Sequence, residues 1–136
     1  MISFNYETDF ELNEPDQISQ WISKTIIEEN CKEGDINYIF CSDEYLHKIN
    51  VEFLNHDTLT DIISFDYSVG KELHGDIYIS IDRVRENALE FDVDFTNELH
   101  RVMFHGVLHY CGYKDKTENE KVEMRSKEDF YLKELL

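Results

Sequence analysis

Two histidines, His105 and His109, lie four residues apart in the run HGVLHYCGYKD, and Asp115 follows six residues later. Side chains four apart in a helix lie on the same face, so both imidazoles can direct a nitrogen at one ion. Gly112 favours the end of that helix, and the turn brings Asp115 toward the same point. Two histidines and one carboxylate leave room for water on a catalytic metal, so the pattern predicts metal-assisted hydrolysis.

The residue after the first histidine distinguishes between kinds of hydrolase. The zinc-protease pattern H-E-x-x-H has a glutamate there, which acts as the general base. In this chain the position is Gly106, which cannot take a proton. A peptidase built on this helix would need its base from elsewhere, so the motif favours other substrates.

The apolar periodicity predicts the elements that position the motif. Strands are expected at 2–7, 36–41, 62–67 and 75–81, and the last two should form a hairpin. Helices are expected from Pro15 to near Gly34, from Ser42-Asp43 onward, from Ser80 or Asp82 to about Phe91, from Phe95 to Cys111, and from Thr117 to Leu135.

Two of these helices have informative patterns. The helix that carries the motif is apolar around most of its circumference, which predicts a central, buried position. The last helix is strongly charged, with a thin apolar stripe of Val122, Phe130 and Leu132. The order of elements predicts one α+β domain over residues 1–136, a small mixed sheet of about four strands with helices packed on it.

The composition constrains compartment and partners. The chain of 136 residues has 30 acidic side chains against 13 Lys and Arg, a formal net charge of −17. Such a charge repels polyanions at long range, so a nucleic-acid partner would need a local basic patch. The sequence has no apolar run of membrane-spanning length, and its acidic N-terminus is unlike a signal peptide. Cys31, Cys41 and Cys111 lack paired spacing and indicate reduced thiols, so we expect a cytoplasmic protein.

Four blocks of the sequence resemble the YbeY family of bacterial metal-dependent endoribonucleases. HGVLHYCGYKD is similar to the family signature H-G-x-L-H-x-x-G-Y-D-H. TDIISFDY (60–67), HGDIYIS (74–80) and NEKVEM (119–124) are similar to three further family segments, in the same order. The resemblance implies a YbeY-like, zincin-related fold in which the buried helix carries the metal site.

The same resemblance implies the activity and its partners. His105, His109 and Asp115 would hold one Zn²⁺ ion and serve in catalysis, with other divalent ions possible. The implied substrate is single-stranded RNA, the implied role is maturation of 16S ribosomal RNA and ribosome assembly, and the implied partner is the small ribosomal subunit. The oligomeric state stays open.

The chain departs from the family pattern at two places. Asp115 stands where the family has a third histidine, and Lys114 where it has the preceding aspartate. Aspartate is a competent zinc ligand, although a carboxylate makes the bound water somewhat less acidic. Leu54 stands where the family usually has an arginine, which would bind phosphate. Three arginines could replace it, each otherwise a solvated helix residue: Arg83, Arg85 and Arg101.

Other polar residues have a site role and a structural role open. Asp61 and Ser64 could line the cleft, or could cap a turn and bond within a strand. Glu118 and Glu120 are near the motif, but acids favour the first turn of a helix for its dipole alone, and the sequence names no general base. The remaining histidines, with His56 expected on a surface loop, have no such partners in sequence: His47, His56, His74 and His100.

Two functions of other classes also remain open. A metal hydrolase of a peptide or small molecule would suit the acidic surface. A largely non-catalytic ribosome-assembly factor with a structural metal would suit the missing arginine at Leu54.

Overall fold

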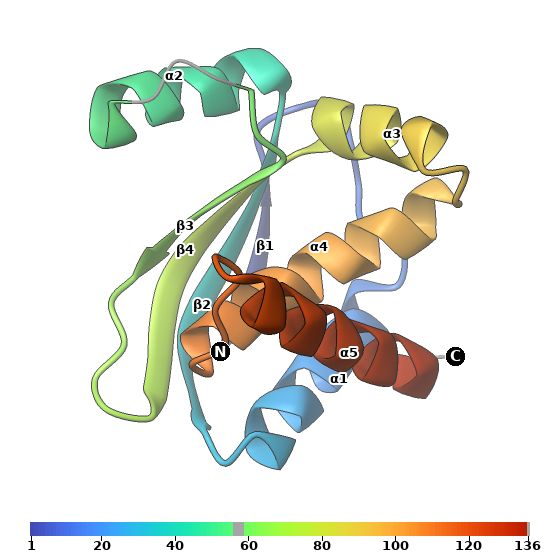
Figure 1. Cartoon of the computed structure of the whole chain (residues 1–136). Coiled ribbons are helices and arrows are strands. Elements are labelled where there is room, and N and C mark those ends of the chain that lie inside the picture. The colour runs from blue at the N-terminus through green and yellow to red at the C-terminus, as the bar shows by residue number, and fades with distance from the viewer. Residues whose placement is uncertain (56–58, 136) are drawn as a thin grey trace.

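The computed structural model describes residues 1–55 and 59–135, and this part of the chain folds as one mixed sheet with helices on both faces (Figure 1). The strands are β1 (Ile2–Tyr6), β2 (Lys32–Cys41), β3 (Ile62–Asp66) and β4 (Glu72–Ser80). The helices are α1 (Pro15–Glu28), α2 (Asp43–Leu54), α3 (Ile81–Glu90), α4 (Phe95–Tyr110) and α5 (Glu118–Leu135). The α+β class is confirmed.

The four strands lie in the order β1-β2-β4-β3. β1 pairs with β2 and β2 with β4 in parallel, whereas β3 pairs with β4 antiparallel and forms the expected hairpin. Since successive side chains of a strand point to opposite faces, the sheet presents two apolar faces. Tyr38, Phe40 and Ile77 belong to the main core, and Cys41 and Ile63 to a smaller core on the other side, with Leu46 of α2.

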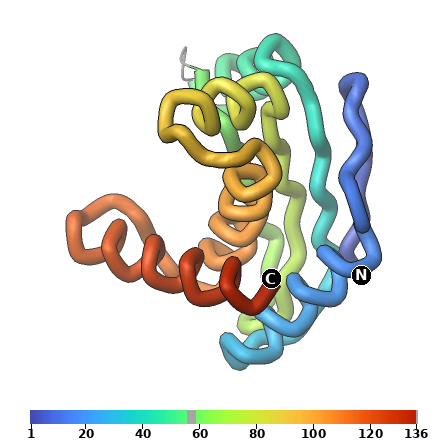
Figure 2. The backbone as a smooth tube through the Cα atoms, turned by 90° about the vertical axis from the view of Figure 1, so that its right-hand side faces the viewer, coloured from blue at the N-terminus to red at the C-terminus, as the bar shows by residue number. Residues whose placement is uncertain are grey.

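Helix α4 lies across the large-core face, and α5 packs on its far side, so α4 is enclosed between the sheet and α5 (Figure 2). This position explains why its sequence is apolar around most of its circumference. A Cβ at Gly106 would lie 3.1 Å from side-chain atoms of Ile62 and Ile77, so the glycine allows the helix to approach the sheet closely. Gly106 therefore faces β3 and β4, and this position offers no side chain that could transfer a proton.

Two expectations about helices are wrong. α1 ends at Glu28 rather than near Gly34, because Asn30 takes a left-handed backbone (φ 61°) and the chain then enters β2, which contains Gly34. In α5, Val122 and Phe130 are exposed, and of the expected stripe only Leu132 is buried. The stripe that packs on α4 and α1 is rotated around the helix and consists of Met124, Glu128, Tyr131, Leu132 and Leu135.

Side-chain caps set the starts of two helices as expected. The Ser42 hydroxyl accepts a hydrogen bond from the Tyr45 amide (3.2 Å) at the start of α2. Of the two alternatives for α3, Ser80 is the cap, accepting from the Arg83 amide (3.1 Å). Both bonds satisfy donors that a helix start leaves open.

We expect Gly75→Ala to destabilise the fold strongly. A Cβ at Gly75 would lie 2.2 Å from the Tyr110 hydroxyl and 2.5 Å from the backbone oxygen of Phe65, to which that hydroxyl donates a hydrogen bond. Overpacking costs about 1–3 kcal/mol of unfolding free energy and occasionally more, and we expect Gly75→Ala to lose at least about 3 kcal/mol because a backbone oxygen leaves little room to adjust. Urea denaturation measures the change. Gly70→Ala is the control, since nothing lies near its Cβ, and its left-handed backbone (φ 60°) should cost only about 1–2 kcal/mol. An unchanged midpoint for Gly75→Ala would contradict the prediction.

Candidate metal centre

Three ligand atoms from α4 and the segment after it converge on one point. The Nε2 atoms of His105 and His109 lie 3.0 Å apart. The Asp115 Oδ2 atom lies 3.1 Å from the first and 3.3 Å from the second. The four-residue spacing places both imidazoles on one face of α4, where the rings meet edge-on, and Gly112 (φ 108°) turns the chain so that Asp115 returns to them. The structure thus brings together the three residues that the sequence singles out.

The far nitrogen of each imidazole is held by an acceptor. His105 Nδ1 lies 2.7 Å from Glu128 Oε2 on α5, and His109 Nδ1 lies 2.9 Å from the backbone oxygen of Tyr113. A carbonyl oxygen only accepts, so His109 Nδ1 carries the proton, and a carboxylate partner assigns the same role to His105 Nδ1. In the neutral rings both Nε2 atoms then present lone pairs toward each other.

The donor set fits a bound cation. Two imidazole lone pairs and one carboxylate oxygen that face one another need a positive charge between them, and nitrogen and oxygen donors in this number suit an open zinc site. Backing of each metal-binding histidine by an acceptor is the usual arrangement around such ions. His105, His109 and Asp115 also form the metal-competent cluster found among the described residues.

The electrostatics of the site favour positive charge. Burial by itself lowers the pKa of His105, but the Glu128 hydrogen bond and charge, with the charges of Asp115 and Asp61, raise it above its usual value. Tyr113, whose carbonyl holds His109, is in turn fixed by its hydroxyl, which donates to Glu29 (2.6 Å). The same Glu29 accepts from the Tyr131 hydroxyl of α5. The site is therefore supported by the residue that caps the end of α1 as well as by α5.

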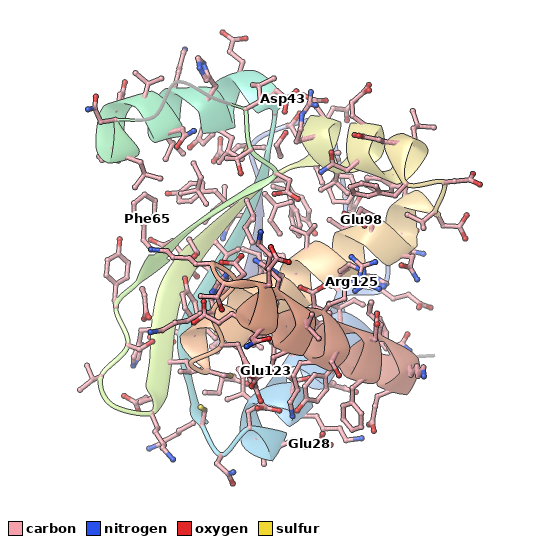
Figure 3. The ribbon with its side chains drawn as sticks, in the orientation of Figure 1. Glu28, Asp43, Phe65, Glu98, Glu123 and Arg125 are labelled. Carbon is pink, nitrogen blue, oxygen red and sulfur yellow. The ribbon has the colours of Figure 1, made fainter. Side chains whose placement is uncertain are left out.

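The metal cluster lies in a pocket of about 580 Å³ between the sheet edge, α4 and α5. Asp61 and Ser64 line this pocket, which agrees with the first of their two expected roles, lining the cleft. Burial raises the pKa of Asp61, and burial together with the Asp61 charge raises the pKa of Glu98. Glu98 on α4 and Arg125 on α5 line the same pocket from facing helices (Figure 3).

The three arginines that could replace the family arginine absent at Leu54 lie in different surroundings. Arg101 lines the pocket, but it donates to Glu128 (2.9 Å) and Asp129 (2.7 Å) and its side chain is only 15% exposed, so its assignment as a solvated surface residue is wrong. Arg83 pairs with Asp43 (2.9 Å), and Arg85 lies over the Phe95 ring. Neither Arg83 nor Arg85 belongs to the described lining of the pocket.

Two cations that the sequence analysis did not select, Lys121 and Arg125 of α5, also line the pocket. Glu128 was missed as well, although a signal existed. Arg101, His105 and His109 form one stripe of α4 at four-residue spacing, and a buried polar stripe needs acids on the facing helix. Glu118 and Glu120 are not those acids. Glu118 lies outside the pocket lining, and Glu120 accepts from the Thr117 amide (2.9 Å) in a cap of α5.

The other histidines and the cysteines lie elsewhere. His74 bonds to Glu72 and to the Asp35 amide, and burial lowers the pKa of His100. His56 lies outside the described residues. The cysteines are free thiols, and burial raises the pKa of Cys41 to about 12. In the part of the chain that the structure describes, no helix combines the length and apolar character needed to cross a membrane.

Comparison of the sequence and of the fold with known proteins identifies relatives of this chain. The profile of one protein family, described as Endoribonuclease YbeY, matches residues 3–136. Proteins named Endoribonuclease YbeY from Flavobacterium psychrophilum and Flavobacterium johnsoniae are 65% and 62% identical, over 98% and 95% of this chain and 95% and 93% of their own. A Thermotoga maritima protein solved in solution superposes with a TM-score of 0.71 at 26% identity, covering 99% of this chain and 89% of the other.

Proposed function

The chain belongs to the YbeY endoribonuclease family, and on that premise we propose that it is a metal-dependent endoribonuclease acting on single-stranded RNA. His105, His109 and Asp115 hold the ion and are the catalytic centre. The observation that carries the proposal is the convergence of their three lone pairs inside a pocket that also contains Lys121 and Arg125.

Zinc is the proposed ion, because two imidazoles and one carboxylate are ligands that it takes in open catalytic sites. When bound, such an ion supplies Lewis acidity and an acidified water for phosphodiester hydrolysis. The family signature has a third histidine where this chain has Asp115, so one neutral ligand is replaced by a negatively charged one. We therefore expect a somewhat higher pKa for the water than a three-histidine set would give.

The other pocket residues divide into two roles. Lys121 and Arg125 are the cations placed to contact the phosphates, and Arg125 takes the part of the arginine absent at Leu54. Asp61 and Glu98, whose pKa values are raised by burial, are the groups suited to hold or release a proton near the reacting phosphate. Arg101 stays engaged with two carboxylates and orients Glu128.

The biological role that we propose is maturation of small-subunit (16S) ribosomal RNA, with association with the small ribosomal subunit, in the cytoplasm. The chain would act as one hydrolase domain over residues 1–136. Family membership supports this role. The net charge of −17 agrees with it only because the pocket carries local cations.

Metal removal tests the activity. Purified protein is expected to contain one zinc ion per chain, to cleave single-stranded RNA, and to leave an RNA duplex and casein intact. A chelator should abolish the cleavage, and added Zn²⁺ should restore it, while circular dichroism stays unchanged. Cleavage of casein instead of RNA would support a peptide hydrolase. Cleavage of neither, with metal and ribosome association retained, would support an assembly factor.

A further inference from the structure

A second groove runs along the outer face of α5, beside the metal pocket. It is shallow, because all of its lining residues belong to α5, and they include Lys121, Arg125, Phe130 and Lys133. Lys121 and Arg125 line the metal pocket as well, so the groove continues directly from the proposed active site. α5 lies on the outside of the molecule, with its other side on α4 (Figure 2).

The charge of this groove is opposite to that of the whole protein. Three of the 13 Lys and Arg residues of the chain line it, in a protein of net charge −17. Its acid, Asp129, accepts a hydrogen bond from Arg101 (2.7 Å), which offsets part of its charge, so three cations face one partly paired acid. In the described ranges 1–55 and 59–135, neither Arg125 nor Lys133 forms an ion pair. Lys121 has only an exposed contact of 3.7 Å with Glu118. These cations are available to an anionic partner.

An exposed aromatic ring lies among the cations. Phe130 is 48% exposed, and its ring meets the Tyr131 ring edge-on at 5.0 Å, which fixes it against the helix while one side stays open. Cations that follow a backbone, combined with aromatic platforms, are how proteins bind single-stranded nucleic acids without regard to sequence. The groove has no continuous apolar centre of the kind that protein interfaces use, because Lys121, Arg125 and Lys133 interrupt its apolar surface.

We propose that the outer face of α5 is the track along which single-stranded RNA extends from the metal pocket. Lys121 and Arg125 contact the phosphates nearest the metal, a base stacks on Phe130, and Lys133 contacts a phosphate farther along. From Lys121 to Lys133 the helix rises about 18 Å, which accommodates several nucleotides of extended strand. The track rests on the proposed function, because it assigns a path to the same substrate.

RNA length and two variants test the track. The full-length chain is titrated, in chelator so that no turnover occurs, with fluorescent single-stranded RNAs of four and twelve nucleotides. The longer RNA should bind at least about tenfold more tightly. Phe130→Ala should lose at least about fivefold of that affinity, the lower end of the range for one stacked base. Lys133→Gln should lose a similar factor and flatten the salt dependence of binding by about 0.7 in log–log slope. Neither variant should change the binding of the short RNA.

Lys48→Gln is the matched control, since Lys48 is a 70% exposed lysine on α2, outside the lining of the groove. Its affinity for both RNAs should equal that of the wild type. Lys133 is exposed, so Lys133→Gln should fold. Its RNA affinity therefore tests the track even if Phe130→Ala fails to fold. Wild-type binding of the long RNA by Lys133→Gln and by any folded Phe130→Ala would overturn the track. Absence of RNA cleavage by the metal-loaded wild type, with the length effect and the variant effects intact, would overturn the proposed activity and leave the track standing.

Discussion

His109→Ala is expected to lose its bound zinc and to cleave single-stranded RNA at least about 10³-fold more slowly than the wild type, because metal-ion catalysis supplies several kcal/mol of transition-state stabilisation. The remaining ligands, His105 and Asp115, form too small a set to hold the ion at catalytic geometry. The fold should persist. The His109 side chain is partly exposed, and the core around α4 is built by other residues, such as Phe104 and Val107.

Metal content by mass spectrometry, a cleavage assay and a thermal melt measure the three parts of this result. His100→Gln is the control, because His100 is on the same helix but outside the described lining of the metal pocket. It should retain both zinc and cleavage. If His109→Ala held one zinc ion per chain with wild-type affinity, the assignment of His109 as a ligand would be wrong.

The local part of the site could be predicted from the sequence because it depends on helix geometry alone. Four-residue spacing fixes the relation of His105 to His109 wherever the helix lies. A glycine that ends the helix fixes the return of Asp115. The hairpin of β3 and β4 could also be predicted from local sequence, since a short connection between two apolar strands leaves few alternatives.

The part that could not be predicted depends on how α5 crosses α4. Glu128 and Arg125 reach the pocket only because α5 packs with Met124, Tyr131 and Leu135 inward. The sequence offered a competing stripe through Val122 and Phe130, and an exposed aromatic residue is indistinguishable there from a buried one. A prediction that buries Val122 and Phe130 rotates α5 about its axis and places Glu128 away from the site. The mutual position of two helices is a property of their contact, and neither sequence contains it alone.

The packing of α5 on α4 also bears on how a strongly acidic protein could bind RNA. A net charge of −17 argues against an RNA substrate when it is treated as a uniform surface. The structure instead gathers three cations, Arg101, Lys121 and Arg125, in one pocket with four acids, so the pocket is far closer to neutral than the whole chain. A bound divalent ion adds two further positive charges at the centre. Phosphate contacts act over short distances at physiological salt, since screening reduces interactions beyond about 8 Å. The distant acids therefore weaken the approach of RNA more than its binding.

Glu128→Gln is expected to weaken zinc binding and RNA cleavage by about 10- to 100-fold, the usual effect of removing a carboxylate behind a metal-binding histidine. Glu128 accepts from His105 Nδ1 (2.7 Å) and from Arg101 (2.9 Å) and is buried. Glutamine keeps the shape of the side chain but not the charge that makes the imidazole a stronger ligand. Arg101 retains Asp129, so the helix contact should survive.

A pH series separates this role from a merely structural one. Burial lowers the pKa of His105 and Glu128 raises it, so removing the carboxylate charge should lower that pKa. Protons then compete with zinc only at lower pH, and the pH at which zinc affinity begins to fall should shift downward in Glu128→Gln. Zinc affinity is measured by competition with a chelating dye across pH 5–8. Glu123→Gln, a change of an exposed acid on the same helix (Figure 3), should leave both the affinity and its pH profile unchanged. A loss of zinc affinity in Glu128→Gln without that shift would show that Glu128 holds α5 in place rather than tuning His105.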